Sequence, residues 1–234
     1  MRHLTFIRGG ALAAAAALAL TAGPVVAAEP AVVDVQKISA YSVELSNRSS
    51  NYVPVGITLD PGADTSSIDH ISLTLLVDGM DERTFDVRED MGVMEVVLPD
   101  DIGLGKARFV RSTIHYTAAS GLPPTEDTTP SNAFYVRRAT TYWPLYYKKS
   151  GTKMTFYARG IGIYKPSTHS FESLRTVKLQ YRKGGTWRTK KTLTLDAKGN
   201  GRYAYRSKTV YQYRFYSAIT TTSGGLAVSL PRKR

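Results

Sequence analysis

Apolar residues alternate with polar or small residues along most of the chain. Residues 53–59 place Val or a larger aliphatic side chain at every second position, and residues 71–77 repeat the pattern. In a later run, the alternate positions that are apolar include Val110, Ile114 and Tyr116. We call the set of alternate positions that is mainly apolar the apolar parity of a run. The other alternating runs of the first half are residues 85–87, 94–98 and 134–136. Because successive side chains of a strand point to opposite faces, these runs predict half-buried antiparallel strands.

Turn-forming residues separate these runs. The breaks fall at Asp60-Pro61-Gly62, Asp78-Gly79, Pro99-Asp100-Asp101 and Gly121-Leu122-Pro123-Pro124. About seven strands with turns at intervals of about 8–12 residues are typical of a β-sandwich. No part of the chain after the N-terminal segment shows the spacing of apolar residues that is typical of an amphipathic helix.

The second half has the same pattern with different residues. Its alternating runs are residues 154–158, 177–181, 187–195, 203–205, 211–215 and 226–230. Within one of them, Lys191 falls on the apolar parity of Trp187 and Leu193, which indicates a β-bulge or an edge strand at that point. The hairpin turn of residues 196–201 ends in Asn200-Gly201, a pair that favours tight turns.

Charge divides the chain into an acidic and a basic part. Residues 29–137 contain 17 Asp or Glu and 8 Lys or Arg, whereas residues 138–234 contain 2 and 21. Eleven of the 15 tyrosines also follow residue 137. A shift this sharp marks a domain boundary, placed at Arg137-Arg138. The sequence therefore predicts an all-β protein of two tandem Ig-like antiparallel β-sandwich domains, residues 29–137 and 138–234.

Residues 1–28 have the three parts of a secretory signal peptide. Arg2, His3 and Arg8 form a basic segment, residues 9–22 are apolar and uncharged, and residues 25–28 are small or apolar, as at a cleavage site. We expect a secreted, extracellular protein, either free or associated with the cell envelope, with a retained membrane anchor as the alternative. The chain has no cysteine, so thiol catalysis and cysteine-ligated zinc are excluded and folding depends on packing alone.

The second half resembles a known group of proteins. The segments that carry the resemblance are Arg138 to Thr141, Lys148 to Thr152, Val177 to Arg182, Gly185 to Arg188 and the hairpin Asp196 to Tyr205, followed by Tyr213-Arg214-Phe215. They are similar to the C-terminal Ig-like domain of actinobacterial secreted two-domain proteins of unassigned function. The resemblance implies an extracellular Ig-like module, and it supplies no functional residues.

No catalytic, cofactor-binding or metal-binding constellation is evident. His70 beside Asp69 lacks a nucleophile in a recognisable turn, and no two histidines have metal-ligand spacing. The loop of residues 60–64 offers two carboxylates to calcium, but the loop of residues 196–201 departs from a calcium-binding pattern at Lys198. The acid pairs Asp81-Glu82, Glu89-Asp90 and Asp100-Asp101 suit a solvated face better than a glycosidase site. We expect a protein that is not an enzyme and has no cofactor.

Two features of the basic half bear on binding. Lys178, Arg182, Arg188 and Lys190 lie opposite the apolar parity of two adjacent runs, so they are predicted to form one cationic sheet face for polyanion contact. The competing interpretations are that this charge aids solubility or faces the acidic domain. The aromatic run of residues 142–147 is interpreted as a core strand with Pro144 at an edge, in preference to a sugar-binding platform.

These observations favour a secreted, non-enzymatic Ig-like protein that contacts the cell envelope. Its expected partner is an anionic envelope polymer or an extracellular protein, with no specific nucleic acid, and the two domains could also contact each other. One alternative is a carbohydrate-binding module, which requires Trp143 or Trp187 to be exposed. A less favoured alternative is a calcium-assisted hydrolase built on the acidic loops of the first half.

Overall fold

The computed structural model describes residues 33–48 and 50–233. Its elements are nineteen strands and three short 3-10 helices within those residues, so the all-β prediction is confirmed. Among the described residues, no helix is long and apolar enough to cross a membrane. The predicted signal peptide, residues 1–28, lies outside the described part of the chain.

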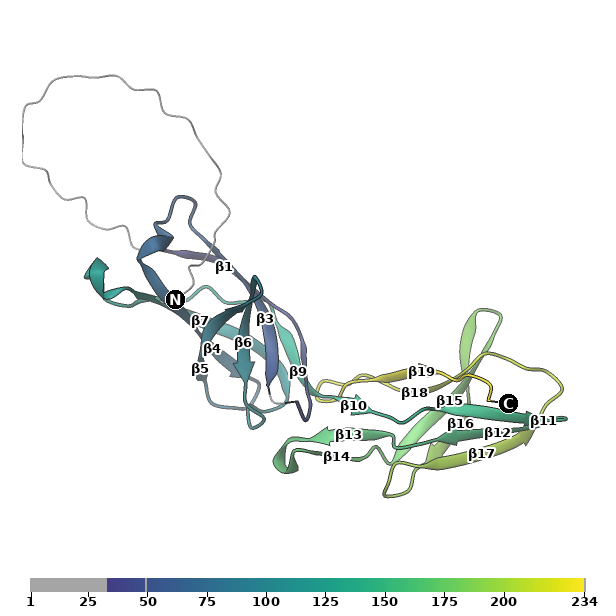
Figure 1. Cartoon of the computed structure of the whole chain (residues 1–234). Coiled ribbons are helices and arrows are strands. Elements are labelled where there is room, and N and C mark those ends of the chain that lie inside the picture. Colours follow the sequence, from purple (N-terminus) through teal and green to yellow (C-terminus); the bar gives the residue numbers. More distant parts are fainter. Residues whose placement is uncertain (1–32, 49, 234) are drawn as a thin grey trace, which may run out of the picture. The chain divides into compact units, whose positions relative to one another are not determined.

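The first nine strands form one continuous path of paired strands. Along this path the order is β1-β3-β6-β5-β4-β7-β9-β2, with β8 beside β7, and these strands form the purple-to-teal group in Figure 1. The strands are β1 (Val35–Ala40), β2 (Val43–Leu45), β3 (Asn51–Leu59), β4 (Ile68–Val77), β5 (Arg83–Asp90), β6 (Val93–Leu98), β7 (Gly105–Tyr116), β8 (Thr125–Asp127) and β9 (Phe134–Arg138). All named pairs are antiparallel except β2 with β9.

Strand β5 connects the two layers of this sandwich. Its first part pairs with β4, where Phe85 lies opposite Leu73, and its last part pairs with β6, where Val87 lies opposite Val96. Val96 from one layer and Leu73 and Phe109 from the other are fully buried in the same cluster. The alternation in the sequence therefore places apolar side chains between two layers, as expected for a sandwich.

A β-bulge changes the predicted parity of β7. The pairing shifts so that Thr74 lies opposite Arg111 while Leu75 lies opposite Phe109, which leaves Val110 as the extra residue. Phe109 is fully buried and Val110 only half-buried, although the sequence pattern assigns the core position to Val110. A bulge adds one residue to one strand, so the side chains beyond it point to the opposite face from the one that simple alternation predicts. The sequence pattern alone does not show where such a residue is inserted.

The second half contains three sheets. Their orders are β11-β12-β17, β16-β15-β18-β19 and β10-β13-β14. The strands are β10 (Thr140–Thr141), β11 (Tyr146–Ser150), β12 (Lys153–Ala158), β13 (Gly162–Lys165), β14 (Ser170–Ser173), β15 (Thr176–Lys183), β16 (Thr186–Thr194), β17 (Gly201–Arg206), β18 (Tyr213–Ser217) and β19 (Leu226–Ser229).

The first two of these sheets enclose a second core. Phe156 from β12 and Tyr213 and Phe215 from β18 belong to one cluster of buried residues. The rings of Phe156 and Tyr213 meet edge to face with their centroids 4.8 Å apart, an arrangement that aromatic pairs prefer. The described residues thus bury two separate apolar clusters, one in each half of the chain.

Strand β16 carries the expected bulge at its centre. Leu179 lies opposite Lys191 and Gln180 lies opposite Thr189, so Lys190 is the extra residue. β16 is also the first strand in the order of its sheet. Both features explain how a lysine occupies the apolar parity of this strand, because an edge strand at a bulge leaves that position open to solvent.

The β13–β14 hairpin joins the two halves. It pairs with β10, beside which it lies in Figure 1, and it places Tyr164 in the core of the first half. The Tyr164 hydroxyl donates a hydrogen bond of 2.6 Å to Asp100 Oδ2, and burial together with this carboxylate raises the pKa of Tyr164 to about 12. Asp100 Oδ1 also accepts a hydrogen bond from the Asn51 side chain (2.8 Å), and His169 Nδ1 lies 2.6 Å from Asp100 Oδ2.

This hairpin bears on the domain organisation. Tyr164 and Phe171 follow the predicted boundary at residues 137–138 in sequence but pack with the core of the preceding half. Residues 32–234 also form one compact unit by their contacts. Two domains that meet at Arg138 therefore remain a prediction.

Removing the Tyr164 hydroxyl tests this junction. We expect Tyr164→Phe to lower the free energy of unfolding by about 1–3 kcal/mol, because the hydrogen bond from a buried hydroxyl to a half-buried carboxylate is lost. Urea unfolding followed by circular dichroism measures the change. Tyr142→Phe is the matched control, since Tyr142 is 47% exposed. Equal stability of Tyr164→Phe and the native chain would contradict the prediction.

Candidate functional site

The four cations predicted to share one sheet face are divided between two sides of the sheet. Residues directly opposite each other in an antiparallel pair project to the same side. Arg182 lies opposite Trp187, on the side that also carries Lys178, whereas Arg188 lies opposite Tyr181. Tyr181 packs against the second core, so Arg188 lies on the core side of the sheet at its edge. The prediction of a single face formed by all four residues is wrong.

The bulge in β16 is the reason for this difference. Lys190 is the extra residue, and its Nζ lies 4.5 Å from the centre of the Tyr205 ring, which belongs to the other sheet. If alternate residues of β16 are assigned to alternate faces without allowing for the bulge, Arg188 and Lys190 are placed on the wrong face of the sheet. Only Lys178 and Arg182 remain together on the outer side of β15, and whether either binds a polyanion stays a prediction.

A larger cationic surface lies on the other sheet of the second half. In β11-β12-β17, Phe156 and Met154 of β12 are fully buried, so residues of the opposite parity form the outer face. Register brings these residues into three rows: Tyr146, Tyr157 and Arg202; Lys148, Thr155 and Ala204; Ser150, Lys153 and Arg206. We call this surface the tyrosine–cation face.

The charge of this face is of one sign. Its cations Lys148, Lys153, Arg202 and Arg206 are all exposed. None of the three strands contains an Asp or Glu. Neighbouring strands lie about 4.8 Å apart, which is well inside the screening length of about 8 Å at physiological salt. Lys153 and Arg206, which lie directly opposite each other on β12 and β17, therefore act on an anion together.

Two stacked tyrosines form one end of the tyrosine–cation face. The rings of Tyr146 and Tyr157 lie 4.9 Å apart and are inclined by 24°. Lys233 Nζ lies 5.0 Å from the Tyr146 ring centre, and Arg202 Cζ lies 5.6 Å from the Tyr157 ring centre. Cation–π attraction at these distances holds both cations against the tyrosine pair. The result is a row in which two stacked tyrosine rings lie between two cations.

A groove begins where this row ends. It has a volume of about 460 Å³ and is lined by Trp143, Pro144, Tyr146, Arg159, Gly160, Lys198, Asn200 and Lys233. Three of these residues are cationic, and all three are exposed. A neighbouring depression of about 400 Å³ lies against Tyr157 and Arg202 and shares Arg159 and Asn200 with the groove. The groove is therefore continuous with the tyrosine–cation face.

The aromatic run at this groove is only partly in the core. Leu145 and Tyr147 are buried, but Trp143 is 70% exposed and Tyr142 is 47% exposed. The core interpretation of residues 142–147 is therefore wrong for its first two aromatic residues. The strand β11 starts only at Tyr146, so the alternation that buries Tyr147 does not extend back to Trp143.

Gly160 fixes the orientation of the Trp143 ring. The Trp143 backbone amide donates to the Arg159 carbonyl (3.0 Å), and a Cβ atom added to Gly160 would lie only 1.9 Å from Trp143 Cδ1. Gly160 has φ of 54° and donates its amide hydrogen to Asn200 Oδ1 at 3.1 Å. Its lack of a side chain lets the indole pack directly on the backbone, which only glycine permits here.

The predicted hairpin turn of residues 196–201 supplies one wall of the groove. Asp196 Oδ1 accepts the backbone amides of Lys198 (2.9 Å) and Asn200 (2.8 Å). The hydrogen bond from the Asn200 amide is the main cause that lowers the pKa of Asp196. The Asp196 carboxylate is thus hydrogen-bonded within its own turn, which agrees with the interpretation of residues 196–201 as a hairpin turn. Lys198 lies in the same turn.

The histidines of the first half form a cluster that the sequence did not reveal. His70 and His115 lie opposite each other on β4 and β7, and their rings stack with centroids 4.1 Å apart. His70 contacts Asp69 at 2.9 Å, and Ser72 lies 3.2 Å from His115 Nε2. The buried Ser72 hydroxyl also donates a hydrogen bond of 2.9 Å to Asp86 Oδ1 on β5.

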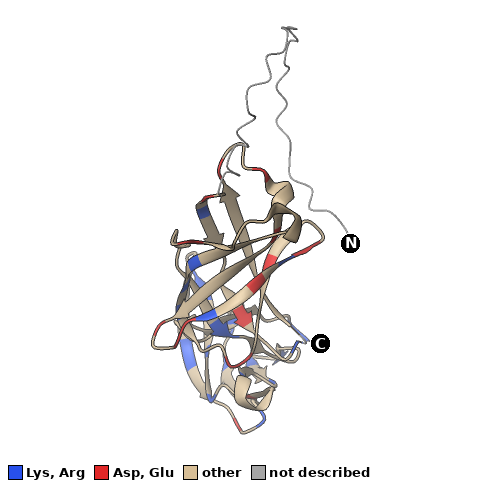
Figure 2. Cartoon of the chain, turned by 90° about the vertical axis from the view of Figure 1, so that its left-hand side faces the viewer, with Lys and Arg blue, Asp and Glu red and all other residues tan. Residues whose placement is uncertain are grey.

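The acidic loops have structural partners. Asp64 caps a short 3-10 helix (Thr65–Ser67) by accepting the Ser66 amide, and Asp60 accepts from Gln36. Within residues 33–48 and 50–233, no three His, Cys, Asp or Glu side chains are grouped to hold a metal ion. Figure 2 shows Asp and Glu, in red, on turns and on several strands of the first half. They are spread over these elements, as expected of a solvated acidic surface.

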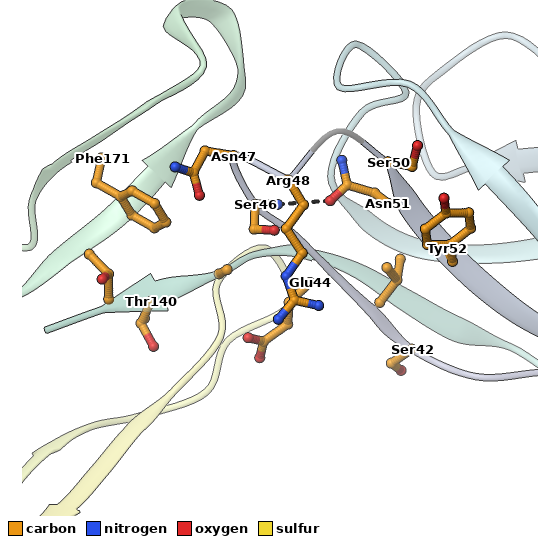
Figure 3. Close-up of a pocket in the computed structure, with 13 residues that line it drawn as sticks. Ser42, Glu44, Ser46, Asn47, Arg48, Ser50, Asn51, Tyr52, Thr140 and Phe171 are labelled. Atoms are coloured by element: carbon orange, nitrogen blue, oxygen red, sulfur yellow. Dashed lines mark hydrogen bonds between the residues drawn. The ribbon is translucent and has the colours of Figure 1, made fainter.

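A cavity of about 780 Å³ lies beside β10. Figure 3 shows Arg48 extending into it, and Asn51 accepting the Ser46 backbone amide at 2.9 Å. Its other lining residues are mainly Ser, Thr and Asn. The exposed aromatic and cationic groups that characterise the groove at Trp143 are sparser here, so the groove is the stronger candidate site.

Comparison with known proteins gives only distant structural likenesses. No family model matches the chain, and no curated protein matches it. A two-domain fibronectin type III segment of chicken tenascin has 11% identity and a TM-score of 0.39, covering 84% of this chain and 98% of its own. Drosophila OTK extracellular domains 3–5 have 10% identity and a TM-score of 0.25, covering 88% and 67%. The Bacillus anthracis TIE protein has 11% identity and a TM-score of 0.23, covering 86% and 39%.

The signal for the tyrosine–cation face was present in the sequence but incomplete. Lysine or arginine stands at both polar ends of residues 202–206, as it does in residues 178–182, and Lys153 and Tyr157 stand at the same positions of residues 153–157. Which of these runs become neighbours depends on strand order, and strand order is not encoded in local alternation. The exposure of Trp143 depends likewise on where a strand begins.

Proposed function

We propose that this protein is a secreted, non-enzymatic Ig-like protein that binds an anionic polymer of the cell envelope or its surroundings through the tyrosine–cation face. The observation that carries the proposal is a sheet face with four exposed cations on three strands that contain no Asp or Glu. Secretion rests on the signal-like pattern of residues 1–28.

Electrostatics supports a polymer over a small anion. A polyanion that contacts several cations releases its condensed counterions, which favours binding and makes it depend on salt. A single small anion would meet only one or two exposed side chains, whose attraction water largely screens. The rows of the face place their cations at intervals that one extended chain can follow.

The salt dependence of binding tests this proposal. We expect the purified protein to bind inorganic polyphosphate, with the logarithm of the association constant falling by about 3 per tenfold increase in salt if four cations take part. Fluorescence anisotropy of labelled polyphosphate between 50 and roughly 500 mM salt measures the slope. Absence of binding at low salt, or binding that is indifferent to salt, overturns the proposal.

A further inference from the structure

We propose that the groove at Trp143 is a subsite for a negatively charged sugar unit, so that the polyanion bound by this protein is an acidic polysaccharide. This inference rests on the proposed function and names the class of polymer. The groove combines an exposed aromatic platform with three cations, and it opens onto the tyrosine–cation face.

The first step is the platform itself. Trp143 is 70% exposed, and one side of its ring is packed on Gly160, where an added Cβ would approach Cδ1 to 1.9 Å. The ring is therefore held in one orientation before any ligand arrives, which lowers the entropic cost of stacking on it. The electron-rich face of an indole attracts groups that carry partial positive charge. The C–H groups on one side of a pyranose ring are such groups.

The second step is the charge around the platform. Arg159, Lys198 and Lys233 all line the groove and are exposed. A guanidinium binds a planar carboxylate through two parallel hydrogen bonds, and an ammonium binds carboxylate, sulfate or phosphate oxygens. The nearby Asp196 carboxylate is engaged by the amides of its own turn. A neutral sugar would use the platform but leave these cations without partners.

The third step is the path of a polymer. Tyr146 lines the groove and also stacks on Tyr157. Arg159 lines both the groove and the adjacent depression, which reaches Arg202. One chain can therefore lie with a sugar on Trp143 and continue along the tyrosine row, where further anionic groups meet the cations. The groove volume of about 460 Å³ falls within the range of roughly 300–1,000 Å³ typical of small-ligand sites.

Two polymers of different chemistry separate the sugar subsite from simple charge. Polygalacturonate offers carboxylated sugar rings, whereas inorganic polyphosphate offers charge without a ring. We expect Trp143→Ala to weaken polygalacturonate binding about tenfold and to change polyphosphate binding less than twofold, because polygalacturonate loses the ring on which a sugar packs, whereas polyphosphate has no ring to pack there. Tyr142→Ala removes an exposed neighbouring aromatic that does not line the groove, and it should leave both affinities unchanged.

Tryptophan fluorescence gives an independent measurement on the same protein. Polygalacturonate should quench the emission of the native chain and of Trp187→Phe, but not that of Trp143→Ala. Neutral dextran should bind at least tenfold more weakly than polygalacturonate at low salt.

Each other outcome has a separate meaning. Equal losses for both polymers in Trp143→Ala would overturn the sugar subsite while leaving the proposed polyanion function intact. Failure of the native chain to bind either polymer would overturn the proposed function itself. Stronger binding of single-stranded DNA than of polygalacturonate, lost in Trp143→Ala, would identify the stacked group as a base and refute the glycan assignment.

Discussion

Phe156→Ala is expected to lower the free energy of unfolding of the second half by about 3–5 kcal/mol. The Phe156 side chain is fully buried between the two sheets and contacts the rings of Tyr205 and Tyr213. Truncation to alanine removes these contacts and leaves a cavity that the sandwich fills only in part. The chain has no disulfide to offset the loss, since it contains no cysteine.

Intrinsic fluorescence during urea unfolding measures this effect. Both tryptophans, Trp143 and Trp187, lie in the second half, so their emission reports that half alone. Val210→Ala is the control, because Val210 is 44% exposed and its truncation should cost less than about 0.5 kcal/mol. A destabilisation by Phe156→Ala of less than about 1 kcal/mol would show that the second core is not packed as described.

The same experiment tests the predicted division into two domains. Far-ultraviolet circular dichroism follows the strands of both halves, whereas fluorescence follows only the second. If the halves unfold independently, Phe156→Ala shifts the fluorescence transition and leaves a later transition in circular dichroism. If Tyr164 and its bond to Asp100 couple them, the two signals shift together.

Neutralising the tyrosine–cation face is expected to abolish most polyanion binding. Replacing Lys148, Lys153, Arg202 and Arg206 with glutamine removes the exposed charges of the face without adding any. With about 1 kcal/mol for each cation near an anionic surface, the affinity for polyphosphate should fall by a factor of about 10²–10³. The slope of binding against salt should fall with it. Anisotropy at about 50 mM salt measures both.

A matched variant distinguishes a specific face from net charge. Replacing Lys178, Arg182, Arg188 and Lys190 with glutamine removes the same number of charges, but these residues are divided between two sides of the other sheet. We expect this variant to retain the native affinity within about threefold, since scattered surface charges contribute little. Equal losses in both variants would mean that overall charge, and no particular face, drives binding.

The local properties of the chain were predictable because they depend on near neighbours. Alternation located most strands, and the turn residues at Asp78-Gly79 and Asn200-Gly201 separated strands as expected. The anomaly at Lys191 correctly indicated a bulge at an edge. These predictions were correct because the backbone geometry of a strand or turn, and the burial of one face of a strand, depend on residues that are close in sequence.

The errors share a different cause. Val110 and Arg188 were assigned to the wrong positions because a single inserted residue reverses the side of the sheet to which the side chains beyond it point. Trp143 was assigned to the core because the start of β11 is set by its pairing with β12. In each case a partner strand that is distant in sequence decided the outcome.

The sequence by itself determined an all-β chain without cysteine, the parity of most strands and the separation of charge between its halves. Only the tertiary structure decided which cations became neighbours, how Tyr164 entered the core of the first half and how Gly160 left room for Trp143. Alternation is a property of one strand, whereas a surface is made by several. Strand order and register, which depend on long-range pairing, convert the same basic residues into one continuous face or into scattered charges.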